Sequence, residues 1–248
     1  MATEDTEQNP FTRPRFIVAA VVVGLIVVLG IVIGIATATR NNSNAAPPSA
    51  PSSAASAAPT AVPSAAAGGA SVCGLPGEVL SGSIPTAPKA QWEYQGTTAY
   101  PTSTTYGPAK TSDQGFRYCF QHSPTGALFA AANAIAQGAD PAVRAKWADY
   151  VLAAGPNRAA IAASLNGAKS DSSGTRMRVA GFRVLTYDGE TARIDVAVNG
   201  STNQGAIVGS FVYALVWQDG DWKLNTAESE PFSFAVIPNL MGYVPWGE

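Results

Sequence analysis

The sequence predicts one α+β domain, in which about three helices pack on an antiparallel sheet, preceded by a transmembrane helix and a disordered linker. Two observations lead to this fold class. The stretch 123–167 contains three runs that each begin at a proline and end at a glycine, as helices do. The stretch 177–228 contains apolar runs separated by Asp-Gly pairs, which is typical of β-hairpins. Helices followed by such a meander indicate an α+β arrangement.

The most apolar stretch is 16–38, which has no charge, no proline and no side-chain amide. At roughly 1.5 Å per residue, a helix of this length crosses the hydrocarbon core of a bilayer. Arg13 and Arg15 precede the stretch, so we expect 1–15 to be cytoplasmic and the rest of the chain to be extracytoplasmic. The alternative is a cleaved signal peptide ending at the A-x-A-like Ala36–Ala38, but the apolar run is longer than a signal core.

The next segment, 39–70, consists almost entirely of Ala, Pro, Ser, Thr, Gly and Asn. It has almost no apolar surface to bury, so we expect a disordered linker that tethers the domain to a cell membrane crossed once. Residues 71–248 are long enough for one domain with its own core. The formal net charge of −2 offers no electrostatic footprint for nucleic acid.

The chain has two cysteines, Cys73 and Cys119. In an oxidising compartment an even pair predicts one disulfide, which would contribute about 2–4 kcal/mol. Two free buried thiols are the alternative. The bridge would join the stretch 71–115, expected to be an irregular wrap with sparse strands, to a short strand at 116–120.

The three helices have clear start signals. Ser123-Pro124 caps a first helix over 125–137, and Asp140-Pro141 opens a second that ends at Gly155. The third runs over 156–167. The first helix is apolar nearly all round and is expected at the centre of the domain. The second has one apolar stripe, formed by Val143, Trp147, Tyr150, Val151 and Ala154.

Two strands are expected within 177–199, around Asp188-Gly189 and with a bulge at Gly181. The loop allows two registers, one with Arg183 opposite Asp195 and one with the pair diagonal. We prefer the first, because the second sets two arginines against each other. In both registers Asp195 lies on a polar face, where a solvated ion pair is its expected role.

A central strand is predicted over 206–217, because it is apolar on both faces. A two-residue Asp-Gly turn then brings Trp217 opposite Trp222 and Leu215 opposite Leu224. The tail, 229–248, is rich in large apolar residues, and its three prolines allow at most a short edge strand near 232–236. We expect the tail to cover its own domain. The alternative is a partner-binding strip led by Trp246.

Little in the sequence indicates chemistry. There is no metal-ligand spacing, phosphate loop or nucleophile elbow, and His122 is the only histidine. We expect His122 to pack near the first helix cap, with catalysis as the alternative. Asp195 is the other candidate, as a strand carboxylate that could act as a base. We expect no metal and no cofactor, and we treat His122, Asp195 and Trp246 as candidate pocket or interface residues.

The pattern WQDGDWKL and the order of helices and strands over about 116–228 resemble the cone-shaped NTF2-like fold, in which a curved sheet wraps a long helix. Together with the membrane span and linker, this layout is similar to the VirB8 and TcpC class of conjugation proteins. Locally, YGP at 106–108 and CFQHSPTGALFAAANA at 119–134 resemble an actinobacterial family of membrane-anchored extracytoplasmic proteins associated with mobile elements.

These features favour a non-enzymatic, membrane-tethered interaction or assembly domain with protein partners or self-association in the cell envelope. A component of a conjugation- or secretion-type complex is what the resemblance implies. The alternative is an NTF2-like cone whose pocket binds or isomerises a small apolar ligand.

Overall fold

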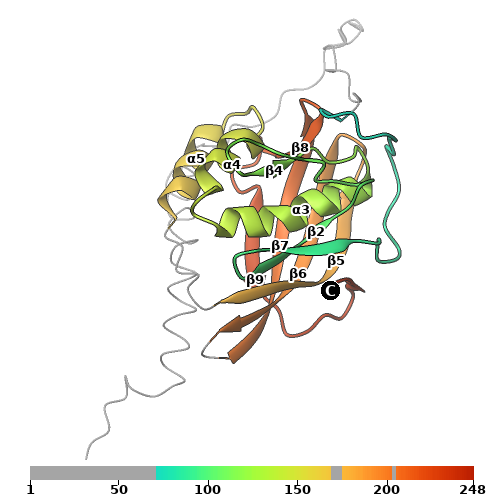
Figure 1. The fold of residues 1–248 in the computed structure, drawn as a ribbon, viewed down its shortest axis with the longest axis vertical. Coiled ribbons are helices and arrows are strands. Elements are labelled where there is room, and N and C mark those ends of the chain that lie inside the picture. Colours follow the sequence, from blue (N-terminus) through green and yellow to red (C-terminus); the bar gives the residue numbers. More distant parts are fainter. Residues whose placement is uncertain (1–70, 169–174, 203–204) are drawn as a thin grey trace, which may run out of the picture. The chain divides into compact units, whose positions relative to one another are not determined.

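The computed structural model describes residues 71–168, 175–202 and 205–248, and it shows three helices on a curled, eight-stranded sheet (Figure 1). The helices are α3 (Pro124–Ala139), α4 (Arg144–Val151) and α5 (Arg158–Gly167). The strands are β1 (Gln91–Gln95), β2 (Thr98–Thr102), β3 (Lys110–Thr111), β4 (Arg117–Tyr118), β5 (Arg176–Tyr187), β6 (Thr191–Thr202), β7 (Gly205–Gln218), β8 (Asp221–Leu224), β9 (Phe232–Val236) and β10 (Val244–Pro245). The predicted α+β class is therefore confirmed.

The main sheet runs in the order β1-β2-β5-β6-β7-β8, with β10 joined to β5 and β9 joined to β7. Its long antiparallel meander, β5 to β7, is the predicted one. The sheet is mixed, however, because β2 meets β5 in parallel. The β1–β2 hairpin comes from the stretch expected to be an irregular wrap, so that stretch contributes to the sheet as well as lying over it.

Helix α3 lies against the concave face of the sheet and forms the centre of the core (Figure 1). Its N-cap is Ser123, whose side chain accepts the backbone N–H of Gly126 at 3.0 Å, as predicted. A Cβ at Gly126 would lie 1.9 Å from the carbonyl oxygen of Gln121, so this position requires glycine. Leu128 and Phe129 on this helix are fully buried.

The second helix is shorter than predicted. Residues 141–143 form a turn, and α4 begins at Arg144. It ends at Val151, because Leu152 bridges Leu224 and the N–H of Ala153 donates to the carbonyl of Leu224. Tertiary pairing with β8 thus replaces the last helical turn that periodicity predicts. Helix α5 begins two residues later than expected.

The strand registers match the predictions closely. Trp217 pairs with Trp222 and Leu215 with Leu224, across a turn in which Asp219 and Gly220 have φ of +56° and +76°. The bulge at Gly181 is present and Arg183 pairs with Asp195. A second irregularity, between Val184 and Thr186, was not predicted and sets Arg193 opposite Thr186.

Among the described residues, no helix is both long and apolar enough to span a bilayer. The expected cytoplasmic segment 1–15, membrane span 16–38 and linker 39–70 lie outside the described residues.

Candidate functional site

The first ten described residues, 71–80, form a strap that we call the tether junction, because the segment expected to be a linker precedes it in the sequence. The two cysteine sulfurs lie at disulfide distance, 1.95 Å, which joins Cys73 to Cys119 as the sequence predicts. Backbone groups of the strap also form hydrogen bonds with the rest of the domain, among them Val72 N to Gly220 O (2.8 Å), Gln121 Nε2 to Pro76 O (2.7 Å), Val79 N to His122 O (2.9 Å) and Tyr187 Oη to Val79 O (2.5 Å).

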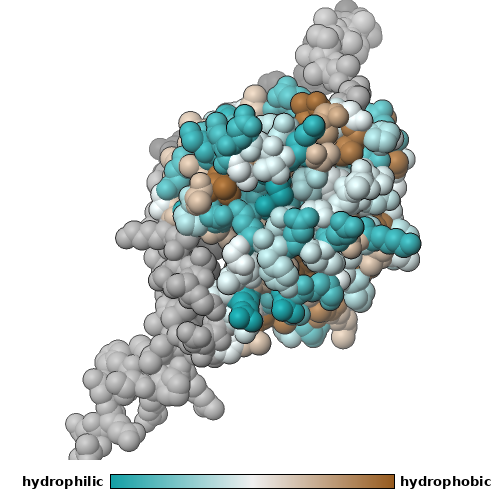
Figure 2. All heavy atoms as spheres, in the orientation of Figure 1, coloured by the Kyte–Doolittle hydropathy of each residue, from teal (hydrophilic) through white to brown (hydrophobic). Residues whose placement is uncertain are grey.

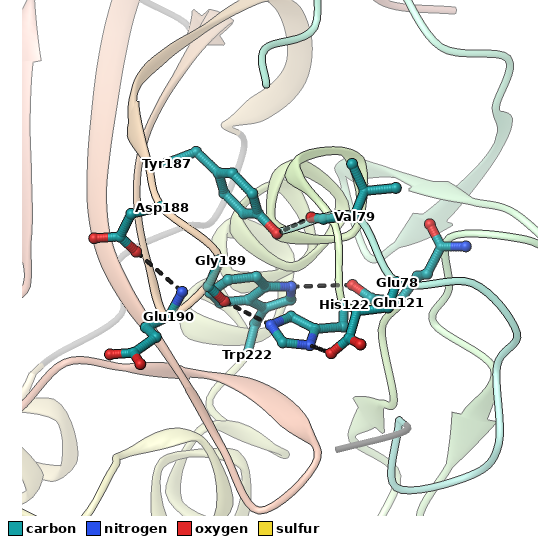
Figure 3. Close-up of polar contacts among 9 residues, drawn as sticks. All are labelled: Glu78, Val79, Gln121, His122, Tyr187, Asp188, Gly189, Glu190 and Trp222. Atoms are coloured by element: carbon teal, nitrogen blue, oxygen red, sulfur yellow. Dashed lines mark hydrogen bonds and ion pairs between the residues drawn. The ribbon is translucent and has the colours of Figure 1, made fainter. Parts of the chain in front are cut away.

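His122 lies beneath this strap and is 1% exposed (Figure 3). Its Nδ1 is 2.6 Å from a carboxylate oxygen of Glu78, and its Nε2 is 2.5 Å from the carbonyl oxygen of Gly189. The imidazole stacks on the ring of Trp217, with centroids 4.0 Å apart and planes at 1°, and its edge meets Trp222. The ring therefore links the strap, the start of α3, the β5–β6 turn and the β7–β8 hairpin.

Both ring nitrogens of His122 have a hydrogen-bond partner inside the protein. The carbonyl of Gly189 only accepts hydrogen bonds, so Nε2 donates to it. Nδ1 pairs with the carboxyl group of Glu78, and the face of the ring packs on Trp217. A ring with both nitrogens bonded and almost no exposed surface has no free lone pair to act as a general base.

Replacing Glu78 tests the contact with His122. We expect Glu78→Gln to lower the free energy of unfolding by about 1 kcal/mol, because an amide is a weaker partner for the imidazole than a carboxylate, and the Glu78 side chain is half-exposed. Glu190→Gln is the matched control, since Glu190 is exposed on the adjacent turn. Urea unfolding of the three proteins measures the effect. Equal losses for both variants would contradict a stabilising role for this contact.

Asp195 is fully buried, on the sheet face away from α3. Its carboxylate accepts hydrogen bonds from Arg183 (Nε at 3.1 Å), Ser210 (2.7 Å) and Tyr243 (2.8 Å). The expected ion pair between Arg183 and Asp195 is present, but the expectation that Asp195 is solvated is wrong. The tail crosses this face of the sheet, and Tyr243 covers the carboxylate. Asp195 lies outside the space between helix and sheet, so it is not placed to act as a base there.

Trp246 lies in the core and is 5% exposed. Its ring is 5.1 Å from that of Trp92, 5.3 Å from Phe129 and 5.6 Å from Phe182, and its Nε1 donates to the carbonyl of Pro88 at 3.0 Å. The structure thus places the end of the tail against its own domain, as preferred from the sequence. It does not bring His122, Asp195 and Trp246 together.

Sequence reasoning missed a buried polar centre at Asp221, which is 1% exposed. Its carboxylate accepts the backbone N–H groups of Cys119 (2.7 Å) and Phe120 (2.9 Å) and the hydroxyl of Tyr150 (2.8 Å). Burial raises the pKa of Asp221, and the two backbone N–H bonds oppose that shift. The centre holds the disulfide-bearing strand end against β8 and α4.

Lys223 lies beside this centre, at one side of a cleft of about 390 Å³ that Arg158, Asp149 and Asp219 also line. Its Nζ donates to the carbonyl of Tyr150 at 2.9 Å and lies 3.1 Å from the centre of the Tyr150 ring. Burial lowers the pKa of Lys223 to about 8, although the Asp221 carboxylate opposes the shift.

The lowered pKa of Lys223 predicts a pH dependence of stability. Between about pH 8 and the ordinary pKa of 10.5, the unfolded chain holds a proton here that the folded chain has lost. Unfolding then takes up a proton, so the stability of the wild type rises with pH through this window relative to Lys223→Met. At ~1.4 kcal/mol per pKa unit the rise is about 2–3 kcal/mol. Urea unfolding of both proteins from pH 7 to 10 measures it, and parallel curves would refute it.

A small cavity of about 10 Å³ lies between α3, α4 and the sheet, lined by residues such as Phe120, Trp147 and Trp222. That volume is roughly what one water molecule needs. Among the described residues, no group of three or more His, Cys, Asp or Glu side chains is placed to hold a metal ion.

The surface around the site is uneven in polarity. Figure 2 shows a largely polar face over the helices, with apolar atoms gathered over the tether junction. The exposed apolar side chains of the junction are Val72, Val79 and Leu80, each about half-exposed. Isolated exposed apolar residues are common, but three within ten positions form a local patch.

Comparison with known proteins identifies a family. Neither a search of curated proteins nor a search of solved structures gives a match. Residues 51–245 match the model of a family described as a domain of unknown function, DUF8175. Because this match spans most of the chain, the protein belongs to the DUF8175 family.

Proposed function

We propose that this protein is a non-enzymatic interaction domain, held outside the cell membrane by the apolar segment 16–38 and the linker 39–70, and that it forms part of a conjugation- or secretion-type envelope complex. On this proposal the curled sheet around α3 is a relative of the cone-shaped NTF2-like domains, as in VirB8- and TcpC-type proteins. On this proposal the mixed strand order and the closing tail of this chain are additions to that layout.

The filled interior is the observation that carries the proposal. An apolar ligand of drug size needs a pocket of about 300 Å³ or more, whereas the cavity that lies between α3, α4 and the sheet measures about 10 Å³. Phe129, Trp222 and Trp246 are all buried in the hydrophobic core of the domain. The larger cleft beside Lys223 lies outside this space and is lined by charged groups.

The buried polar groups support a structural role as well. His122, Asp195 and Asp221 each bond several groups of their own domain. Each one connects segments that are distant in sequence. Side chains used in this way hold surfaces in place, which a domain that works through its surface requires.

Cross-linking in intact membranes tests the proposal. The full chain is expected to stay with membranes after a carbonate wash and to form cross-links from 71–248 to the same few envelope proteins in repeated preparations. Release by carbonate, or a chain that forms no cross-links, would refute it. A stoichiometric small molecule in native mass spectra of the purified chain would instead support the ligand-binding alternative.

A further inference from the structure

The outer edge of β9 is an open sheet edge. Among the described residues, β9 pairs with β7 alone. The carbonyl of Pro231 accepts from Ala214 and the N–H of Ile237 donates to Val208, so the odd-numbered residues of β9 point their backbone groups at β7. The backbone N–H and C=O groups of Phe232, Phe234 and Val236 therefore point away from the sheet.

This edge lacks the devices that usually block strand addition. Natural proteins protect edges with charged side chains, bulges or prolines within the strand. The sequence FSFAV carries no charge, and its register with β7 has no irregularity. Pro231 and Pro238 flank the strand, so they limit its length to five residues but leave the outward groups of the strand itself available.

The spacing of the outward groups makes the edge complementary to itself. If two β9 strands meet antiparallel about a twofold axis at Phe234, then Phe234 faces its own copy and Phe232 faces Val236. All three outward residues then fall at hydrogen-bonded positions, because such positions recur every second residue. A twofold contact uses the same patch on both chains and closes after two copies.

The side chains agree with this arrangement. Phe232, Phe234 and Val236 share one face of β9, and Ile207 lies on the same face of β7. Val236 is 55% exposed and Ile207 is 43% exposed, so much of this apolar strip is uncovered. Since no charged residue lies in β9, a second copy meets no like charge there.

We propose that two copies of this chain pair through β9, antiparallel about Phe234, and so join their sheets into one. The inference rests on the proposed function in one respect only, that the outer domain works through its surface. The first partner of the domain, on this inference, is a second copy of the same chain.

Ser233 and Ala235 supply the test, because both are exposed and the proposed register sets each opposite the other in the second copy. We expect the full chain in detergent to sediment as a dimer, and the double variant Ser233→Lys, Ala235→Lys to raise the dimer dissociation constant by about tenfold or more through like-charge repulsion. Ser233→Glu, Ala235→Glu is expected to do the same. Mixing the two variants is expected to restore pairing. Met241→Lys is the control, since Met241 is 85% exposed in the same tail but outside the strand.

Three outcomes would overturn the pairing: a wild-type chain that stays monomeric, a dimer unaffected by the lysine pair, or variants that do not recombine when mixed. The last comparison also guards against misfolded variants, because only folded strands can recombine. A monomeric wild type that still cross-links to envelope proteins would refute the pairing and leave the proposed function intact.

Discussion

Replacing Trp246 with alanine is expected to lower the free energy of unfolding by about 3–5 kcal/mol, the range for removing a large aromatic ring from a packed core. The indole touches Trp92 from the N-terminal hairpin, Phe129 from α3 and Phe182 from β5. Its loss also leaves the carbonyl of Pro88 without its donor. Urea unfolding, followed by circular dichroism, measures the change.

Met241→Ala is the matched control for this prediction. Met241 belongs to the same tail but is 85% exposed, so its truncation is expected to change stability by less than about 0.5 kcal/mol. A Trp246 variant as stable as the control would show that the tail is not part of the core. Deleting 231–248 is expected to cost more than Trp246→Ala, because it also removes β9 and β10.

Asp221→Ala is expected to destabilise the domain to a similar degree, by about 3–5 kcal/mol. The backbone N–H groups of Cys119 and Phe120 would lose their acceptor inside the protein, and the buried amine of Lys223 would lose the carboxylate that favours its charged form most. Asp221→Asn is expected to lose less, since its amide oxygen still accepts one of the N–H bonds.

Asp219→Asn provides the comparison for Asp221→Asn. Asp219 lies two positions away, is exposed, and has a φ of +56° that asparagine tolerates. Its substitution is expected to change stability by less than about 0.5 kcal/mol. Thermal unfolding of the four proteins would separate the buried carboxylate from the turn. An Asp221→Ala protein that melts with the wild type would contradict the role assigned to the carboxylate.

The parts of the fold that sequence reasoning predicted are those with local signals. Ser123-Pro124 marks a helix start by itself, and Asp219-Gly220 fixes both a turn and the pairing of Trp217 with Trp222. The prolines of the tail bounded a five-residue strand that the structure shows at 232–236. Each of these signals depends only on residues a few positions apart.

The misses depend on contacts between distant segments. Helix α4 ends early because 152–153 bond to Leu224, more than seventy positions away. Asp195 is buried because Tyr243 covers it. The charged residues beside it on the same face of the sheet, taken alone, predict a solvated face. The backbone N–H groups that bind the Asp221 carboxylate lie about a hundred positions before it in the sequence. The sequence around Asp221 shows only a carboxylate next to a turn, which does not indicate burial.

The disulfide has a mechanical consequence for a tethered domain. If the segment before residue 71 tethers the domain as proposed, tension along it enters at the tether junction and passes through the Cys73–Cys119 bridge directly to the segment that leads into α3. The bridge bypasses the segment between the two cysteines, which are 46 positions apart, so roughly 150 Å of contour length cannot be pulled out while the bridge is intact. Under load the oxidised domain would therefore extend only from Cys119 onward. The β1–β2 hairpin lies between the two cysteines, so it would carry none of the tension.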